Sequence, residues 1–245
     1  MTLTVPCLFG LESLVADEMR RLDLKNVRAE NGRVHCEGTL ADIARLNINL
    51  RCGARVLMEL GSFPARDFEA LFQGVYALPW EDYIPRDGEF PVKGYSLNSQ
   101  LHSVPACQSI VKKASAKRLG EKYGVETLPE SGSRYQIQFS IIKDVATLYL
   151  DTSGEGLYKR GYRAKNMGAP LRETLAAALV TLSRYRGKDP FCDPFCGSGT
   201  IPIEAALIAK NRAPGLDRSF AAQKWKNMDS KLWLEAGDEA MDKEF

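Results

Sequence analysis

One glycine-rich segment, Asp193–Thr200 (DPFCGSGT), constrains the fold of this chain more than any other part of its sequence. It follows a short apolar stretch at Phe191–Asp193, which predicts a strand, and precedes a predicted helix from Thr200 to about Lys210. Glycines in such a turn permit positive φ angles and a close approach of a ligand to the backbone. The unpaired N–H groups that open the following helix add positive potential. The segment therefore predicts a ligand-binding turn in a parallel α/β domain.

Spacing separates the ligand classes that use such a turn. A phosphate-binding P-loop needs a Lys after its last glycine, and none follows Gly199. A dinucleotide turn needs a third glycine where this chain has Pro202, and a nucleophile elbow needs wider spacing around Ser198. Asp193 at the end of a strand, before a short glycine turn, suits a ligand with an ammonium group beside a carboxylate, such as the methionine part of S-adenosylmethionine. The structural alternative is an ordinary glycine-rich turn between strand and helix.

The charges of the chain balance overall but not locally. Its 245 residues carry 33 basic and 31 acidic side chains, and this net charge of +2 excludes a histone-like polycation and a disordered acidic chain. Between Val111 and Arg172, however, twelve side chains are basic and six are acidic. This local excess predicts a polyanionic partner.

Neither a membrane protein nor a metal protein is indicated. The sequence contains no run of about 18 apolar residues, and its N-terminus lacks the basic region of a signal peptide. Six cysteines are scattered along it, and the one close pair, Cys192 and Cys196, has no second pair or histidine near it in the sequence. We therefore expect a cytoplasmic protein with reduced thiols, no membrane association and no metal site.

Hydrophobic periodicity predicts two α+β units in the first part of the chain. The predicted elements of residues 1–65 are a helix after Leu11, a strand at Arg33–Glu37, a helix capped by Thr39, and a strand at Val56–Leu60 that Gly61 ends. Those of residues 66–152 are a helix with Phe68, Leu71, Phe72 and Val75 on one face, a strand at Phe90–Ser96, a helix from Ser103 to Tyr123, and strands at Tyr135–Ile142 and Val145–Leu150. Pro91 predicts an edge strand or the start of a strand, and Lys143-Asp144 predicts a tight hairpin.

The remaining residues predict a linker and a different kind of domain. Residues 153–170 are rich in glycine and basic side chains and have no apolar periodicity, which is typical of a linker. Residues 171–245 begin with a predicted helix from Leu171 to about Arg186, before the strand and helix that flank the glycine turn. The expected fold class is therefore α+β followed by the opening elements of an α/β domain.

A family resemblance extends over almost the whole chain. The glycine-rich octapeptide resembles motif I of the amino-methyltransferases. Five further segments are similar to THUMP-domain RNA methyltransferases: Asp151–Leu157, Lys159–Arg163, Ala169–Ala177, Ile203–Ala206 and Asn211–Gly215. The family is the bacterial RlmL/YpsC-like group, which methylates the N2 amine of guanine in large-subunit ribosomal RNA.

The resemblance implies a ferredoxin-like domain in residues 1–65, a THUMP RNA-binding domain in 66–152, and a Rossmann-like class I methyltransferase domain that begins at 171. It implies S-adenosylmethionine as the cofactor and ribosomal RNA as the partner. The implied cofactor loop consists of Asp193, Pro194, Phe195, Cys196, Gly197, Ser198, Gly199 and Thr200. The helix before it would line the cofactor pocket with Arg172, Glu173 and Thr174. The alternative for these three residues is helix capping and packing between domains.

Basic side chains in two segments form the candidate RNA surface. They are Lys112, Lys113, Lys117 and Arg118 on the predicted helix, and Lys159, Arg160, Arg163 and Lys165 in the linker, where Tyr162 would stack on a base. The alternative is a solvated helix face.

The chain departs from the family in the residues that position the methyl acceptor. Amino-methyltransferases hold the amine with an [ND]-P-P-[YFW] tetrapeptide. Asp189–Phe191 and Asp193–Phe195 both lack its second proline, and no acidic residue for the ribose hydroxyls can be assigned. We therefore expect this sequence to be the N-terminal portion of a larger enzyme, with unknown catalytic residues, and to be inactive in methyl transfer on its own. The alternative function is that of a non-catalytic THUMP-type RNA-binding protein or fragment.

Overall fold

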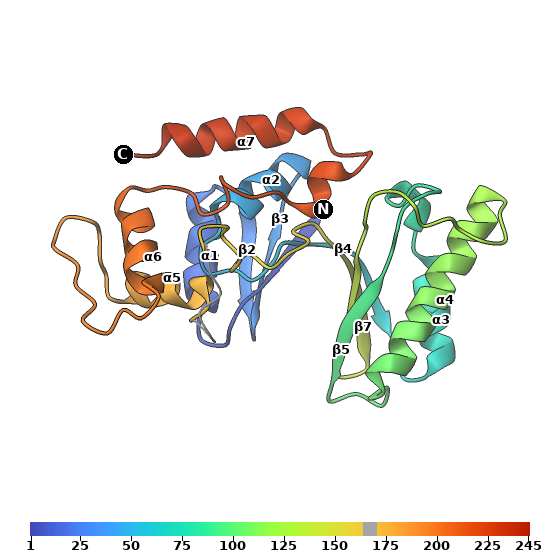
Figure 1. The fold of residues 1–245 in the computed structure, drawn as a ribbon. Coiled ribbons are helices and arrows are strands. Elements are labelled where there is room, and N and C mark those ends of the chain that lie inside the picture. Colours follow the sequence, from blue (N-terminus) through green and yellow to red (C-terminus); the bar gives the residue numbers. More distant parts are fainter. Residues whose placement is uncertain (164–170) are drawn as a thin grey trace. The chain divides into compact units, whose positions relative to one another are not determined.

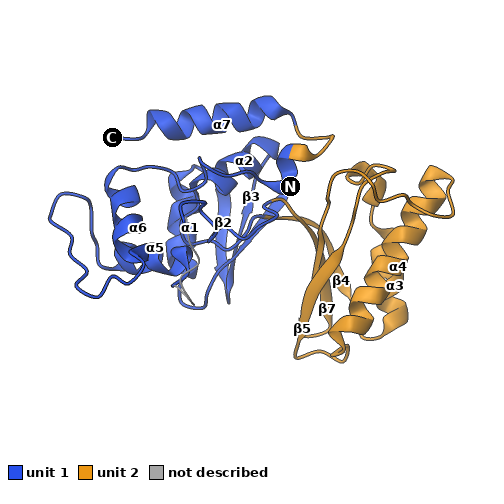
Figure 2. Ribbon diagram, in the orientation of Figure 1, with its two compact units in different colours: residues 1–56, 153–223, 229–245 blue, residues 57–152, 224–228 orange. Residues whose placement is uncertain are grey.

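The computed structural model describes residues 1–163 and 171–245, which form two compact units (Figures 1 and 2). The first unit contains residues 1–56, 153–223 and 229–245, and the second contains residues 57–152 and 224–228. Segments from both ends of the chain therefore fold together in the first unit. The predicted domains follow one another along the chain, with boundaries at 65/66 and 152/153. These boundaries place in different domains residues that belong together to the first unit.

The first unit contains a three-stranded antiparallel sheet in the order β2-β3-β1. Its elements are β1 (Thr2–Pro6), α1 (Glu12–Arg21), β2 (Lys25–Glu30), β3 (Arg33–Glu37) and α2 (Leu40–Asn49). Apolar side chains of both helices are fully buried, among them Val15 and Met19 of α1 and Ile43 and Leu46 of α2. The two predicted helices and the strand at Arg33–Glu37 are confirmed. Strand β2 was not predicted because almost all of its side chains are exposed, which leaves no apolar alternation to detect.

Helix α2 begins in a reciprocal capping box, as its sequence predicts. The Thr39 hydroxyl accepts a hydrogen bond from the backbone N–H of Asp42 at 3.3 Å. The Asp42 carboxylate in turn accepts the backbone N–H of Thr39 at 2.9 Å. Two N–H groups that would otherwise lack partners at the start of the helix are thus satisfied.

Three further helices complete the first unit: α5 (Glu173–Leu182), α6 (Thr200–Ala209) and α7 (Ser230–Asp242). Helix α7 packs on α2 (Figure 1) and buries Trp233, Ala236 and Ala240. Arg45 of α2 donates two hydrogen bonds, of 2.9 and 3.0 Å, to Glu239 of α7. A short 3-10 helix at Ala221–Lys224 precedes α7.

The strand expected at Phe191–Asp193 is not formed, and this prediction was wrong. These residues belong to an extended, largely exposed segment between α5 and α6. A parallel strand is stable only when neighbouring strands pair with it. No strand in the described part of the chain pairs with these residues.

The second unit is a four-stranded mixed sheet, in the order β4-β7-β6-β5, with two helices. Its elements are β4 (Leu57–Pro64), α3 (Phe68–Ala77), a 3-10 helix at Trp80–Asp82, β5 (Val92–Leu97), α4 (Val104–Tyr123), β6 (Ile137–Ile142) and β7 (Val145–Asp151). Strands β5 and β6 are parallel, and the other pairs are antiparallel. Helices α3 and α4 pack together (Figure 1).

Most predictions for the second unit are confirmed. The hairpin turn falls at Lys143-Asp144, with φ angles of 51° and 62°, and β5 is an edge strand as Pro91 indicates. Strand β4 does not end at Gly61, because an irregularity in its register lets it pair with β7 as far as Pro64. The chain returns to this unit at residues 224–228, which follow a segment of the first unit. Here the ring of Trp225 stacks on that of Tyr135, with 5.1 Å between their centroids.

Removal of the capping box should destabilise the protein measurably. We expect Thr39→Ala to lower the free energy of unfolding in urea by about 1 kcal/mol, because the N–H of Asp42 loses its acceptor. Thr39→Ser keeps the hydroxyl and should stay close to the unsubstituted chain. Equal losses in the two variants would show that the methyl group of Thr39, rather than the cap, accounts for the effect.

Candidate functional site

The glycine-rich segment forms the turn that leads into α6. The Asp193 carboxylate accepts the backbone N–H of Phe195 at 3.1 Å, and the carbonyl of Cys196 accepts that of Gly199 at 2.8 Å. Gly199 is the residue before the helix, and no side chain caps the helix there. The N-terminal N–H groups of α6 therefore remain available to a ligand.

Backbone conformation explains both glycines of this turn. Gly197 and Gly199 have φ angles of 52° and 77°, in the left-handed region that strains other residues. A Cβ atom on Gly197 would meet no atom within 4 Å, and one on Gly199 would lie 3.7 Å from Ile203. Within the chain, glycine is therefore required at these positions by conformation and not by lack of space.

Arg163 joins this turn to the start of α5. Its guanidinium donates to Thr200 Oγ1 at 2.9 Å, to Ser198 Oγ at 3.4 Å and to the carbonyl of Leu171 at 2.8 Å. It also forms a short ion pair with Glu173, which is 4% exposed. Glu173 was expected to line the cofactor pocket. In this structure its carboxylate holds Arg163 against the turn.

The other residues expected around the cofactor are less enclosed. Thr174 is buried in α5, whereas Arg172 is exposed and lies over the ring of Tyr158 at 5.3 Å. Phe195 is 93% exposed, and Pro194, Cys196 and Ser198 are also exposed.

The described part of the predicted linker, residues 153–163, belongs to the first unit, and the RNA-contact prediction for Arg160 was wrong. Lys165, also predicted to contact RNA, lies outside the described residues. Arg160 is 3% exposed, and its guanidinium donates to the carbonyls of Leu157 (2.6 Å) and Arg51. It pairs at 3.4 Å with Glu204 of α6, which is fully buried. A guanidinium enclosed in this way has no free face for a phosphate. The periodicity of the segment failed to reveal this because its buried residues include a charged one.

Tyr162 belongs to the same buried cluster. Its hydroxyl donates to Glu204 Oε1 at 3.1 Å, and burial together with the Glu204 carboxylate raises the pKa of the phenol. Burial also raises the pKa of Glu204 against the opposing attraction of Arg160.

The basic residues of α4 differ in how far acidic side chains neutralise them. Arg118 donates two hydrogen bonds, of 3.0 and 2.6 Å, to Glu81, and Lys112 pairs with Glu130 at 2.6 Å. Lys117 is exposed and lies 3.9 Å from Glu121. Lys113 is exposed, and no described residue forms an ion pair with it. Half of the predicted helix surface is therefore neutralised by acidic side chains within the second unit.

Three family models match consecutive parts of the chain. An RlmL ferredoxin-like domain matches residues 2–57, a THUMP domain matches 65–151, and an RMKL-like methyltransferase domain matches 160–243. This series is the one that the sequence motifs suggested. The chain belongs to the RlmL/YpsC-like THUMP family.

Relatives of this family cover nearly all of the chain. A putative RNA methyltransferase, YpsC of Bacillus subtilis, is 45% identical over 244 residues, which are 99% of this chain and 63% of that protein. A ribosomal RNA large subunit methyltransferase K/L of Psychromonas ingrahamii is 36% identical over 94% of this chain and 31% of its own length. This RlmL/YpsC-like chain thus spans less than two thirds of the length of each of these two curated relatives.

Solved structures of similar proteins share the fold. A protein from Listeria monocytogenes, described as a predicted N6-adenine-specific DNA methylase, superposes with a TM-score of 0.95 at 49% identity, covering 99% of this chain and 64% of that one. A putative methyltransferase complexed with SAH superposes with a TM-score of 0.93 at 43% identity and the same coverage. Among the described residues of this family member, no helix is long and apolar enough to cross a membrane, and no cluster of three potential metal ligands occurs.

Replacing only one partner of the buried ion pair between Arg160 and Glu204 should destabilise the protein strongly. We expect Arg160→Met to lower the free energy of unfolding in urea by about 3–5 kcal/mol, because Glu204 is left buried without its partner. The double variant Arg160→Met/Glu204→Met should recover part of this loss. As a control, Glu235→Gln in the exposed pair with Lys231 should change stability little. Additive losses in the double variant would mean that the two side chains are not coupled.

The ion pair between Arg118 of α4 and Glu81 should make the stability of the second unit depend on pH. The Arg118 guanidinium lowers the pKa of Glu81 to about 2 from its ordinary value of 4.5. A lowered pKa stabilises the folded state above pH 4.5, and this stabilisation is lost as the pH falls towards 2.

Glu81→Gln should therefore lower the free energy of unfolding at pH 6 and have almost no effect at pH 2. The exposed Glu126, changed to Gln, serves as the control and should behave alike at both pH values. A Glu81→Gln deficit that persists unchanged at pH 2 would contradict this account.

Proposed function

We propose that this chain carries the cofactor loop and RNA-binding domain of an S-adenosylmethionine-dependent RNA methyltransferase. The observation that carries the proposal is the turn at Asp193–Thr200, which opens α6 with two positive-φ glycines and no side-chain cap. One similar protein was solved with SAH, the product that S-adenosylmethionine becomes after losing its methyl group. A THUMP domain in the same chain favours RNA as the acceptor.

The residues of the turn fit such a cofactor. The free N–H groups at the start of α6 suit a carboxylate, and the Asp193 side chain, which binds only a local N–H here, suits an ammonium group. The bound cofactor would supply an electrophilic methyl group. Arg163 would hold the turn in register with α5 through Thr200 and Glu173.

The acceptor that we propose is an exocyclic amine, the guanine N2 in large-subunit ribosomal RNA. Relatives are named ribosomal RNA large subunit methyltransferases, which supports ribosomal RNA as the substrate. The Listeria protein's description specifies an amine, that of adenine in DNA, which supports an exocyclic amine as the acceptor. On α4, RNA contact is proposed for Lys113 and Lys117, whose exposed ammonium groups are the least neutralised there.

We further propose that residues 1–245 do not complete the reaction by themselves. The sequence contains no [ND]-P-P-[YFW] tetrapeptide to align the amine with the methyl group. Orientation of this kind is worth several orders of magnitude in rate. The chain should therefore show no methyl transfer from tritiated S-adenosylmethionine to ribosomal RNA under conditions in which full-length YpsC is tested beside it. Robust turnover would mean that another residue here positions the amine.

Cofactor binding can be tested at one glycine. Gly199→Val adds a branched side chain at a φ of 77° inside the turn and should abolish the calorimetric signal for SAH. Gly124→Val is a matched control, because it imposes a similar strain at a φ of 63°, with open space around it, at the end of α4. Both variants should melt at similar temperatures. Unchanged SAH affinity in Gly199→Val would remove the turn from the cofactor site.

A further inference from the structure

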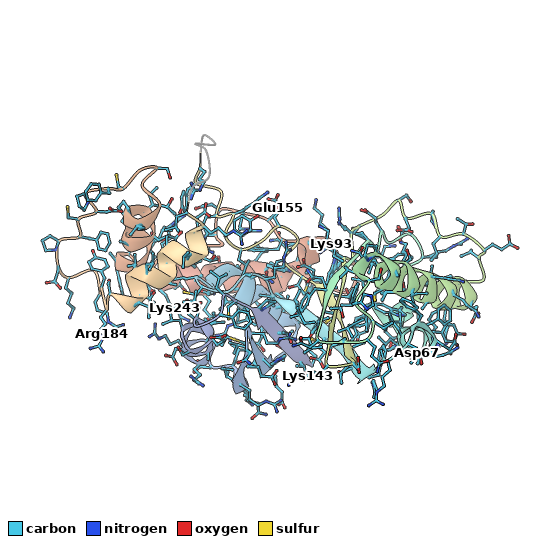
Figure 3. The ribbon with its side chains drawn as sticks, turned by 90° about the horizontal axis from the view of Figure 1, so that it is seen from below. Asp67, Lys93, Lys143, Glu155, Arg184 and Lys243 are labelled. Carbon is cyan, nitrogen blue, oxygen red and sulfur yellow. The ribbon has the colours of Figure 1, made fainter. Side chains whose placement is uncertain are left out.

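The first unit contains a cavity next to the candidate cofactor turn. It has a volume of about 590 Å³ and is lined mainly by Tyr158, Lys159, Arg163, Arg172, Glu173 and Arg218. Glu155, labelled in Figure 3, belongs to the same rim. Cavities of roughly 300–1,000 Å³ are typical of sites for small ligands. The size is therefore compatible with one nucleotide.

The lining of this cavity has an excess of positive charge. Its basic residues are Lys159, Arg160, Arg163, Arg172 and Arg218, and its acidic residues are Glu155 and Glu173. Both acids are already paired, Glu155 with Lys159 at 2.6 Å and Glu173 with Arg163. Arg160 is paired with Glu204, so the charge that favours an anionic ligand is that of Arg172.

Arg172 and Tyr158 form a surface suited to a nucleotide. The exposed guanidinium lies over the aromatic ring at 5.3 Å, and it forms no hydrogen bond or ion pair with any residue in the described ranges 1–163 and 171–245. A guanidinium stacked on a ring keeps its N–H donors at its edge, where they can bind a phosphate. Aromatic rings and arginine planes are also the groups on which bases of single-stranded nucleic acids stack.

The cavity adjoins the candidate cofactor turn. Arg163 lines it and also donates to Thr200 at 2.9 Å and to Ser198 at 3.4 Å. The Arg163 side chain thus borders both the cavity and the turn. A ligand in the cavity would lie close to a cofactor held by the turn.

We propose that this cavity binds a nucleotide of the substrate RNA next to the methylated base, with its phosphate on Arg172 and its base against Tyr158. The inference rests on the proposed function, because it takes RNA as the substrate. It differs from the proposed α4 contacts in that it assigns a nucleotide site to the methyltransferase part of the chain.

Binding of a fluorescein-labelled single-stranded RNA dodecamer to the 245-residue chain tests the proposal by anisotropy. Arg172→Glu should weaken binding at least about 10-fold, and Arg172→Ala should reduce the salt slope by about one counterion. Tyr158→Ala should weaken binding by about 5-fold or more, as loss of a stacking platform predicts. Arg28→Glu, an exposed arginine on β2, is the matched charge control and should change affinity less than 2-fold. Ultraviolet cross-linking should place the RNA on the peptide that contains Tyr158.

Several results would overturn this assignment. They are unaltered RNA affinity in Arg172→Glu, an equal loss in Arg28→Glu, and absence of RNA binding by the unsubstituted chain. SAH calorimetry on the same variants separates this outcome from failure of the proposed function. Retained SAH binding with unaltered RNA affinity would refute the nucleotide cavity alone, whereas loss of SAH binding only in Gly199→Val would still support the cofactor turn.

Discussion

The first unit depends on a buried charge that comes from the least regular part of the chain. Arg160 lies in a segment without periodic structure, yet it is enclosed between the carbonyl groups of Leu157 and of Arg51, in the ferredoxin-like domain, and the carboxylate of Glu204. Burying either charge alone would cost several kcal/mol, so each makes the position of the other possible. The pair therefore joins α6, which carries the candidate cofactor turn, to the N-terminal domain in one unit.

Neutralisation within the protein decides which basic residues can meet a polyanion. Lys112 and Arg118 group with Lys113 and Lys117 in the sequence because all four lie on one helix. The structure separates them, since Glu130 comes from a loop and Glu81 from the 3-10 helix at Trp80–Asp82, neither of which the sequence could place beside α4. In the first unit, the same reasoning removes Arg160 from the surface and leaves Arg172 exposed.

Local signals predicted the elements that depend on local interactions. The cap at Thr39, the turn at Lys143-Asp144 and the helices of both α+β units were predicted because hydrogen bonds or side-chain periodicity within a few residues determine them. The exposed strand β2, the extension of β4 past Gly61 and the absence of a strand at Phe191–Asp193 depend on pairing with distant segments. No feature of their own sequence records that pairing. The same holds for the site, where the glycine turn was found by motif but its tether to α5 through Arg163 was not, because that tether joins distant segments.

The residues from 160 to 163 connect the two ligand sites that we propose. Arg160 and Tyr162 bind Glu204 in the second turn of α6, and Arg163 binds Thr200 in its first turn and Glu173 at the start of α5. Arg163 also lines the cavity assigned to a nucleotide. Because the guanidinium is planar and holds several acceptors at once, a shift of Arg163 would alter both sites together. An RNA contact in the cavity and the geometry of the cofactor turn are therefore expected to influence each other through this one side chain.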